Sequence, residues 1–239
     1  MFYLIERDWA TIFLDAAALI LIAGMFIMTS KFRKRGREDD TLFLVLLILN
    51  AFIAATDCVG YIFDMKPIPG GRMLCMAAMT VFYVAFNLTA MVWFHYCGIR
   101  FMDGGINKGK LIHPVYLPGV IMICLVFINA FTGWIFMYDE AVVYHRGSLF
   151  IPMYILDILY VGSGFLMAAR YQDRSSGRKL VPVWVYAVPV VFGAVFTFAV
   201  PNSASFAAIG IAISISYTHM AMMNEVLNRS RLRRNKSLG

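Results

Sequence analysis

Seven long apolar runs, each bounded by charged residues or by glycine and proline, constrain the fold of this chain more than any other feature. They lie at 9–29, 41–63, 73–99, 115–137, 149–170, 180–201 and 204–226. A helix needs about 20 mostly apolar residues to cross a bilayer, and each run is about that long or longer. The runs therefore predict an all-α membrane protein, a bundle of seven transmembrane helices.

The composition agrees with this expectation. Apolar residues make up 61% of the 239 residues and charged residues 15%, against roughly 45–50% and about 25% in soluble domains. Seven spans consume roughly 140 residues, so we expect no separate folded output domain. The expected organisation is a transmembrane domain over 1–227 and a basic tail over 228–239.

The basic residues are distributed unevenly between the two ends of the predicted bundle. Of the 21 Lys and Arg residues, 17 lie in the 30–40, 100–110 and 170–179 segments and in the tail, and four lie at the other end. The positive-inside rule then places the amino terminus outside and the carboxyl terminus in the cytoplasm of a multi-pass cell-membrane protein. The tail is expected to face anionic lipid headgroups, so no nucleic-acid partner is expected.

Three acidic residues lie within the predicted spans. Asp15, Asp57 and Asp157 fall six, six and eight residues from the outer ends of their spans, which is on the order of 9–12 Å deep. A charge inside the bilayer is costly unless it faces the bundle interior or a wet cavity. Three acids at one depth favour a shared outward-facing pocket.

Other polar residues keep helical spacing with these acids. The candidate ligand-binding residues are Asp15, Asp57, Tyr83, Asn87, Asn129 and Asp157. The same side chains are equally consistent with hydrogen bonds that merely join helices.

Several chemistries lack their motifs. The seventh run has no lysine for a Schiff base, and no hydrolase, metalloprotease or phosphate-binding motif occurs. We therefore expect no enzyme activity, no cofactor and no metal. His95 and His219 fall at similar depth, where a haem or metal is conceivable, but ordinary hydrogen bonding is favoured. A disulfide between Cys58 and Cys75 stays open.

The stretch FTGWIFMYDEAVVYHRGSLF at 131–150 carries a family resemblance. Together with Asp57, Asp64, Tyr83 and Asn87, it resembles the seven-helix sensory module at the amino end of many bacterial GGDEF diguanylate cyclases and related signalling proteins. The residues that match in the 131–150 stretch are Phe131, Thr132, Tyr138, Tyr144, Arg146 and Gly147, whereas Ser148 stands where proline is usual. The resemblance covers about residues 41–227.

The resemblance implies a receptor whose last helix passes a signal to a cytoplasmic enzyme. After EVLNRS, however, the sequence is RLRRNKSLG, without a GGDEF motif. The chain is therefore expected to be a stand-alone sensor with a separate partner, or else a fragment or degenerate copy, and no catalytic residue carries over.

These observations lead to one hypothesis and one rival. We expect a non-enzymatic membrane sensor whose pocket takes an unknown small ligand and whose seventh helix acts on a homodimer partner or a cytoplasmic signalling protein. The loop residues expected to gate the pocket are Tyr138, Asp139, Tyr144, Arg146 and Gly147, with Arg146 paired to Asp139 or Glu140. The rival is a small transporter or ion-coupled carrier that uses the same acids.

Overall fold

The structure, a computed structural model, describes residues 2–32, 38–63, 68–101, 112–171, 192–193 and 210–217. It contains the helices α1 (Phe2–Phe32), α2 (Glu38–Phe63), α3 (Gly71–Phe101), α4 (Ile112–Thr132) and α5 (Phe150–Tyr171). All five are long and apolar enough to cross a membrane. The described part of the chain is therefore mostly helical and membrane-spanning, as its composition predicts.

The predicted and observed helices agree in four of the five spans that can be compared. The fourth prediction, 115–137, is wrong at its end, because α4 stops at Thr132. Gly133 adopts a left-handed φ of 64°, and its N–H donates to the Asn129 carbonyl at 2.9 Å, which is a common way to end a helix. The sixth and seventh predictions lie outside the described residues except for 192–193 and 210–217, which are helical.

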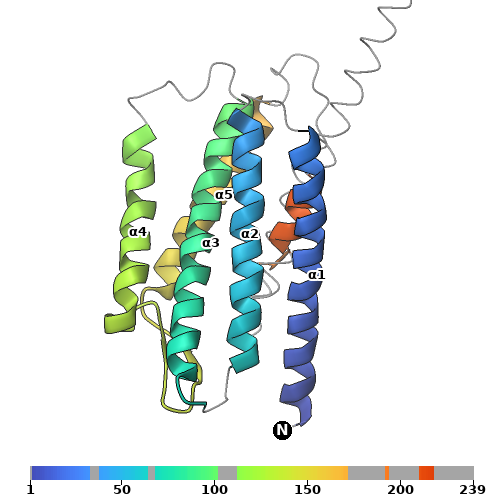
Figure 1. The fold of residues 1–239 in the computed structure, drawn as a ribbon. Coiled ribbons are helices and arrows are strands. Elements are labelled where there is room, and N and C mark those ends of the chain that lie inside the picture. Colours follow the sequence, from blue (N-terminus) through green and yellow to red (C-terminus); the bar gives the residue numbers. More distant parts are fainter. Residues whose placement is uncertain are drawn as a thin grey trace, which may run out of the picture.

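The five helices alternate in direction, with α3 at the centre of the bundle (Figure 1). α3 packs against α2, α4 and α5, while α1 packs against α2. The amino terminus lies at the same end as the link between α4 and α5 (Figure 1). Segment 210–217, orange in Figure 1, lies behind α1 and α2.

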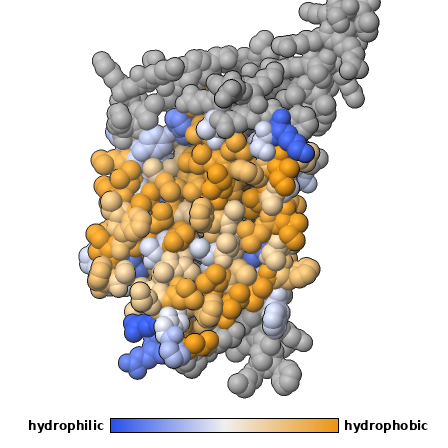
Figure 2. Space-filling view, in the orientation of Figure 1, coloured by the Kyte–Doolittle hydropathy of each residue, from blue (hydrophilic) through white to orange (hydrophobic). Residues whose placement is uncertain are grey.

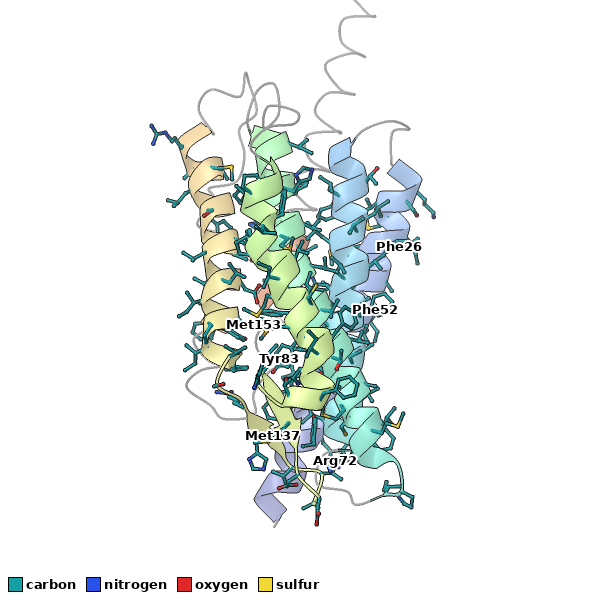
Figure 3. All side chains as sticks on the ribbon, turned by 90° about the vertical axis from the view of Figure 1, so that its left-hand side faces the viewer. Phe26, Phe52, Arg72, Tyr83, Met137 and Met153 are labelled. Atoms are coloured by element: carbon teal, nitrogen blue, oxygen red, sulfur yellow. The ribbon has the colours of Figure 1, made fainter. Side chains whose placement is uncertain are left out.

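Large apolar side chains cover the outside of the bundle. Figure 2 shows them as a broad band between two hydrophilic ends. Phe13 and Phe127 are both more than half exposed, and Figure 3 shows Phe26 and Phe52 on the helices of the same bundle. Lipid chains are the solvent that such a surface requires.

The two largest apolar clusters of the described residues lie in the interior of the bundle at different heights. The first lies at the end of the α4–α5 link and includes Ile53, Tyr83 and Met153. Figure 3 shows Tyr83 and Met153 at this level, with Met137 below them. The second cluster includes Phe43 and Trp93 and joins α1, α2, α3 and α5 to segment 210–217. Most of the buried polar residues lie on the helices around these clusters.

The link between α4 and α5 is a short β-hairpin. Strand β1 (Phe136–Tyr138) pairs antiparallel with β2 (Tyr144–Arg146), with Met137 opposite His145. Phe136 and Tyr138 are buried in the first cluster, whereas Met137 is half exposed. Side chains alternate between the two faces of a strand, so one face of the hairpin packs against the bundle and the other is exposed.

Candidate functional site

The three membrane aspartates are all buried. Asp15, Asp57 and Asp157 expose 0%, 2% and 3% of their surface. The expectation that they face the interior of the bundle agrees with these positions. They divide, however, between two places.

Asp15 and Asp57 lie near each other on α1 and α2. Both interact electrostatically with the Cys58 thiol, and Asp57 also interacts with the Tyr144 phenol of the hairpin. Neither Cys58 nor Cys75 forms a disulfide in the structure. Sequence reasoning considered Cys58 for a disulfide or as a small buried apolar residue. Its position near Asp15 depends on how α1 packs on α2.

Tyr83 ties the centre of the bundle to the hairpin. Its hydroxyl lies 2.5 Å from the Tyr144 hydroxyl, and the Asn87 amide donates to the Tyr83 carbonyl at 3.1 Å. Burial raises the pKa of Tyr144 to about 12, against the opposing effect of its bonds to Tyr83 and Arg146. Tyr144 is therefore a neutral phenol at physiological pH and can hold this contact.

Asn129 also serves the hairpin. Its side-chain oxygen accepts from the Ile135 and Phe136 amides at 2.7 and 3.3 Å, and its side-chain nitrogen donates to the Phe136 carbonyl at 2.8 Å. The side chain is completely buried. These bonds join the end of α4 to the hairpin that follows it, and they do not join one helix to another.

The remaining loop candidates shape the hairpin. Asp139 pairs with His145 at 3.1 Å and not with the expected Arg146, and its pKa is lowered first by the Val143 amide and then by His145. The Arg146 guanidinium instead lies 4.7 Å above the Phe150 ring. The expected pairing considered only Arg146 as the cation and overlooked His145, whose ring reaches the Asp139 carboxylate from the second strand.

At two positions in the hairpin, the backbone restricts which residue can be accommodated. A Cβ on Gly147 would overlap the Trp134 carbonyl, so only glycine fits where the hairpin returns to the helix. Val142 has a φ of 61°, an uncommon conformation for a branched residue. Its side chain is buried in the first cluster, and this packing offsets the backbone strain.

Asp157 occupies a separate place, a cavity of about 140 Å³ in the middle of the bundle. Four parts of the chain enclose it: α2, α3, α5 and segment 210–217. The lining residues are Leu46, Phe86, Thr89, Ala90, Trp93, Tyr154, Asp157, Ile158, Val161, Gly162, Phe165, Ile211, Ser214 and Ile215. None of the other five candidate ligand-binding residues is among them.

Two of the residues that line this cavity carry buried polar atoms with unmet hydrogen-bonding capacity. Neither carboxyl oxygen of Asp157 has a hydrogen-bond partner among the described residues, and neither does the indole nitrogen of Trp93. The Thr89 hydroxyl is occupied, because it donates to the Ala85 carbonyl at 2.8 Å. An unpaired polar group in an apolar interior is costly, so this is where the structure can receive a partner.

Sequence reasoning found Asp157, and Tyr154 at helical spacing from it, but missed the lining residues on the other helices. Phe86, Thr89 and Trp93 recur at helical spacing on one face of α3, yet such a stripe is ordinary in any buried helix. Ser214 lies in a run of small and apolar residues with the same appearance. The sequence offered only the helical spacing of these residues, and that spacing does not reveal a cavity.

No metal centre is evident in the described residues. They contain no group of three or more His, Cys, Asp and Glu side chains placed to hold a metal ion. His95 shares a hydrogen bond of 2.8 Å with the Tyr116 hydroxyl, in keeping with the favoured interpretation, and His219 lies outside the described residues. Comparison with models of known protein families and with curated protein sequences finds no match to this chain.

Proposed function

We propose that this chain is a non-enzymatic membrane sensor in which the Asp157 cavity is the sensing site and the seventh span carries the output. One observation carries the proposal. Ile211, Ser214 and Ile215 of segment 210–217 line the same cavity as Asp157, and that segment lies within the predicted seventh span. A molecule in the cavity would touch both the receptor helices and the helix that leads to the basic tail.

The hairpin supplies a rigid cover at one end of the bundle. Asn129 and Tyr83 hold it by buried hydrogen bonds, and its buried face belongs to the first apolar cluster. With the amino terminus outside, as the charge distribution indicates, this cover faces the exterior. In a complete seven-helix bundle, the signal then passes from the cavity towards the cytoplasmic end and a partner protein or second copy.

A distance measurement tests the relay. Spin labels at Val120 on α4 and Ile213, both exposed, would report the separation of these elements by pulsed electron resonance in a background without the native cysteines. Two variants change the cavity: Asp157→Asn removes its charge, and Gly162→Leu fills its space. We expect either variant to shift the separation by about 2 Å, the scale of helix shifts in switching proteins.

Gly24→Leu is the matched control. A Cβ at Gly24 or at Gly162 meets nothing within 4 Å, but Gly24 does not line the cavity. An unchanged separation in both cavity variants would contradict the relay. Sodium or proton uptake into proteoliposomes that Asp157→Asn abolishes would instead identify a carrier.

A further inference from the structure

We infer that the Asp157 cavity binds a small aromatic ammonium ion, with the ammonium group at Asp157 and the ring packed against Trp93 and Phe165. This inference rests on the proposed function and assigns a ligand class to its site. The evidence comes from the charge, shape and unmet hydrogen bonds of the cavity.

The charge of the lining selects a cation. Asp157 is the one residue of the lining with a formal charge, and both of its oxygens lack hydrogen-bond partners among the described residues. An ammonium group has three N–H donors. It can donate hydrogen bonds to both Asp157 oxygens, and its charge neutralises the carboxylate. An anionic ligand would meet repulsion and no basic side chain in this lining.

Aromatic rings stand at both ends of the cavity. Phe86 and Tyr154, whose ring centres are 5.5 Å apart, flank the Asp157 end, because Tyr154 precedes Asp157 by one helical turn. Trp93 and Phe165, 5.4 Å apart, flank the other end. The faces of the first pair attract a cation, and the second pair matches a flat apolar ring.

The rings of Trp93 and Phe165 favour an aromatic body over an aliphatic one, because aromatic pairs attract beyond the area that they bury. The Cδ1–Nε1 edge of the Trp93 indole packs against Gly164 of α5, where a Cβ would lie 3.0 Å from Nε1. Asp157 and Phe165 are eight residues apart on α5, or about 12 Å, which accommodates a ring and a one-carbon arm.

The volume limits the size of the ligand. A buried apolar cavity of about 150 Å³ holds a benzene molecule, and this cavity measures about 140 Å³. One ring with a short amine arm is therefore close to the upper limit. Ile158 lines the cavity and is also half exposed on the outer surface of α5, so the cavity wall is thin on this side.

Equilibrium dialysis with radiolabelled benzylamine tests the inference on the full chain in lipid nanodiscs, with empty nanodiscs as background. Benzyl alcohol and benzoate have the same ring but are neutral and negative. We expect saturable benzylamine binding that is roughly tenfold or more tighter than that of either analogue, because charge-assisted hydrogen bonds are stronger than neutral ones. Asp157→Asn and Gly162→Leu should each weaken it by at least about tenfold.

One matched variant should bind like the parent protein: Gly24→Leu, which adds the same bulk at an exposed position of α1 outside the cavity. Equal binding of benzyl alcohol, retention of benzylamine by Asp157→Asn, or no saturable binding would each overturn the inference. If amine binding fails while the spin-label separation still responds to Gly162→Leu, the ligand class is wrong and the sensor proposal stands. If benzylamine binds but the spin-label separation responds to neither cavity variant, the ligand class is right and the sensor proposal is wrong.

Discussion

The Asn129 amide bonds to three backbone groups of the chain that follows it, all of them buried. These groups belong to the irregular link and the first strand, where no regular secondary structure satisfies them. Because the side chain supplies both an acceptor and a donor, it replaces the backbone pairing that a helix would have given. One residue thus lets the chain leave a membrane helix without leaving polar groups unpaired.

Asn129→Ala should therefore destabilise the hairpin end of the bundle. It leaves two N–H groups and one carbonyl without their partner, and we expect the free energy of unfolding to fall by about 2–4 kcal/mol. Unfolding in mixed micelles, followed by circular dichroism, measures this change. Thr132→Ala is the control, because the Thr132 hydroxyl makes only a long 3.4 Å bond to the Ile128 carbonyl; an equal loss in both variants would contradict the role of Asn129.

The sequence predicted the burial of these polar residues but not their partners. Asp157 and Asn129 look alike in the sequence, since each is a polar group within an apolar run. Asn129 finds partners in an irregular segment, whose course no periodicity describes, whereas Asp157 lies beside an unfilled cavity. The difference arises from the way in which several separate segments of the chain pack together. The spacing of residues along a single helix could therefore not reveal it.

At the scale of elements, a hydroxyl group of α5 forms hydrogen bonds with two backbone groups of α4. The Tyr160 hydroxyl of α5 donates to the Val115 carbonyl at 2.6 Å and accepts from the Gly119 amide at 3.2 Å. A regular α-helix pairs these two backbone groups with each other. Pro118 lies between them, and a helix there is already weakened by the missing N–H of proline.

Tyr160→Phe should loosen α4 from α5 without removing the ring. We expect the free energy of unfolding to fall by about 1–3 kcal/mol, the cost of leaving a buried polar group unsatisfied. The Gly119 amide should also change its rate of hydrogen exchange, which solution NMR on labelled protein in nanodiscs can follow. Tyr217→Phe, which removes an exposed phenol, should change neither quantity, and an unaltered Gly119 rate in Tyr160→Phe would show that the bridge contributes nothing.

The element boundaries show what hydropathy can and cannot predict. The runs at 41–63 and 149–170 match α2 and α5 closely, because charged or turn-forming residues bound them on both sides. The run at 115–137 continues past the end of α4, since Trp134, Ile135 and Phe136 are as apolar as the helix before them. There the chain turns at Gly133 and becomes a strand, and hydropathy does not distinguish a buried strand from a helix.

At the scale of the whole molecule, the arrangement of the helices and the charge distribution make a joint prediction. The amino terminus and the hairpin lie at one end of the bundle (Figure 1). Of the 21 Lys and Arg residues, the 17 in the 30–40, 100–110 and 170–179 segments and the tail belong to the other end in the predicted topology. Because basic residues near membrane helices stay on the cytoplasmic side, the hairpin should face outward.

Single cysteines test this orientation in a background without the four native ones. Glu140 lies in the hairpin turn and Arg170 at the far end of α5, and both are exposed. An impermeant maleimide added to intact cells should label Glu140→Cys, whereas Arg170→Cys should react only after the cells are permeabilised. The reverse labelling pattern would place the hairpin in the cytoplasm. The proposal of a sensor with an outward-facing cover would then be wrong. The Asp157 cavity could still bind its ligand, because it lies between the two ends of the bundle.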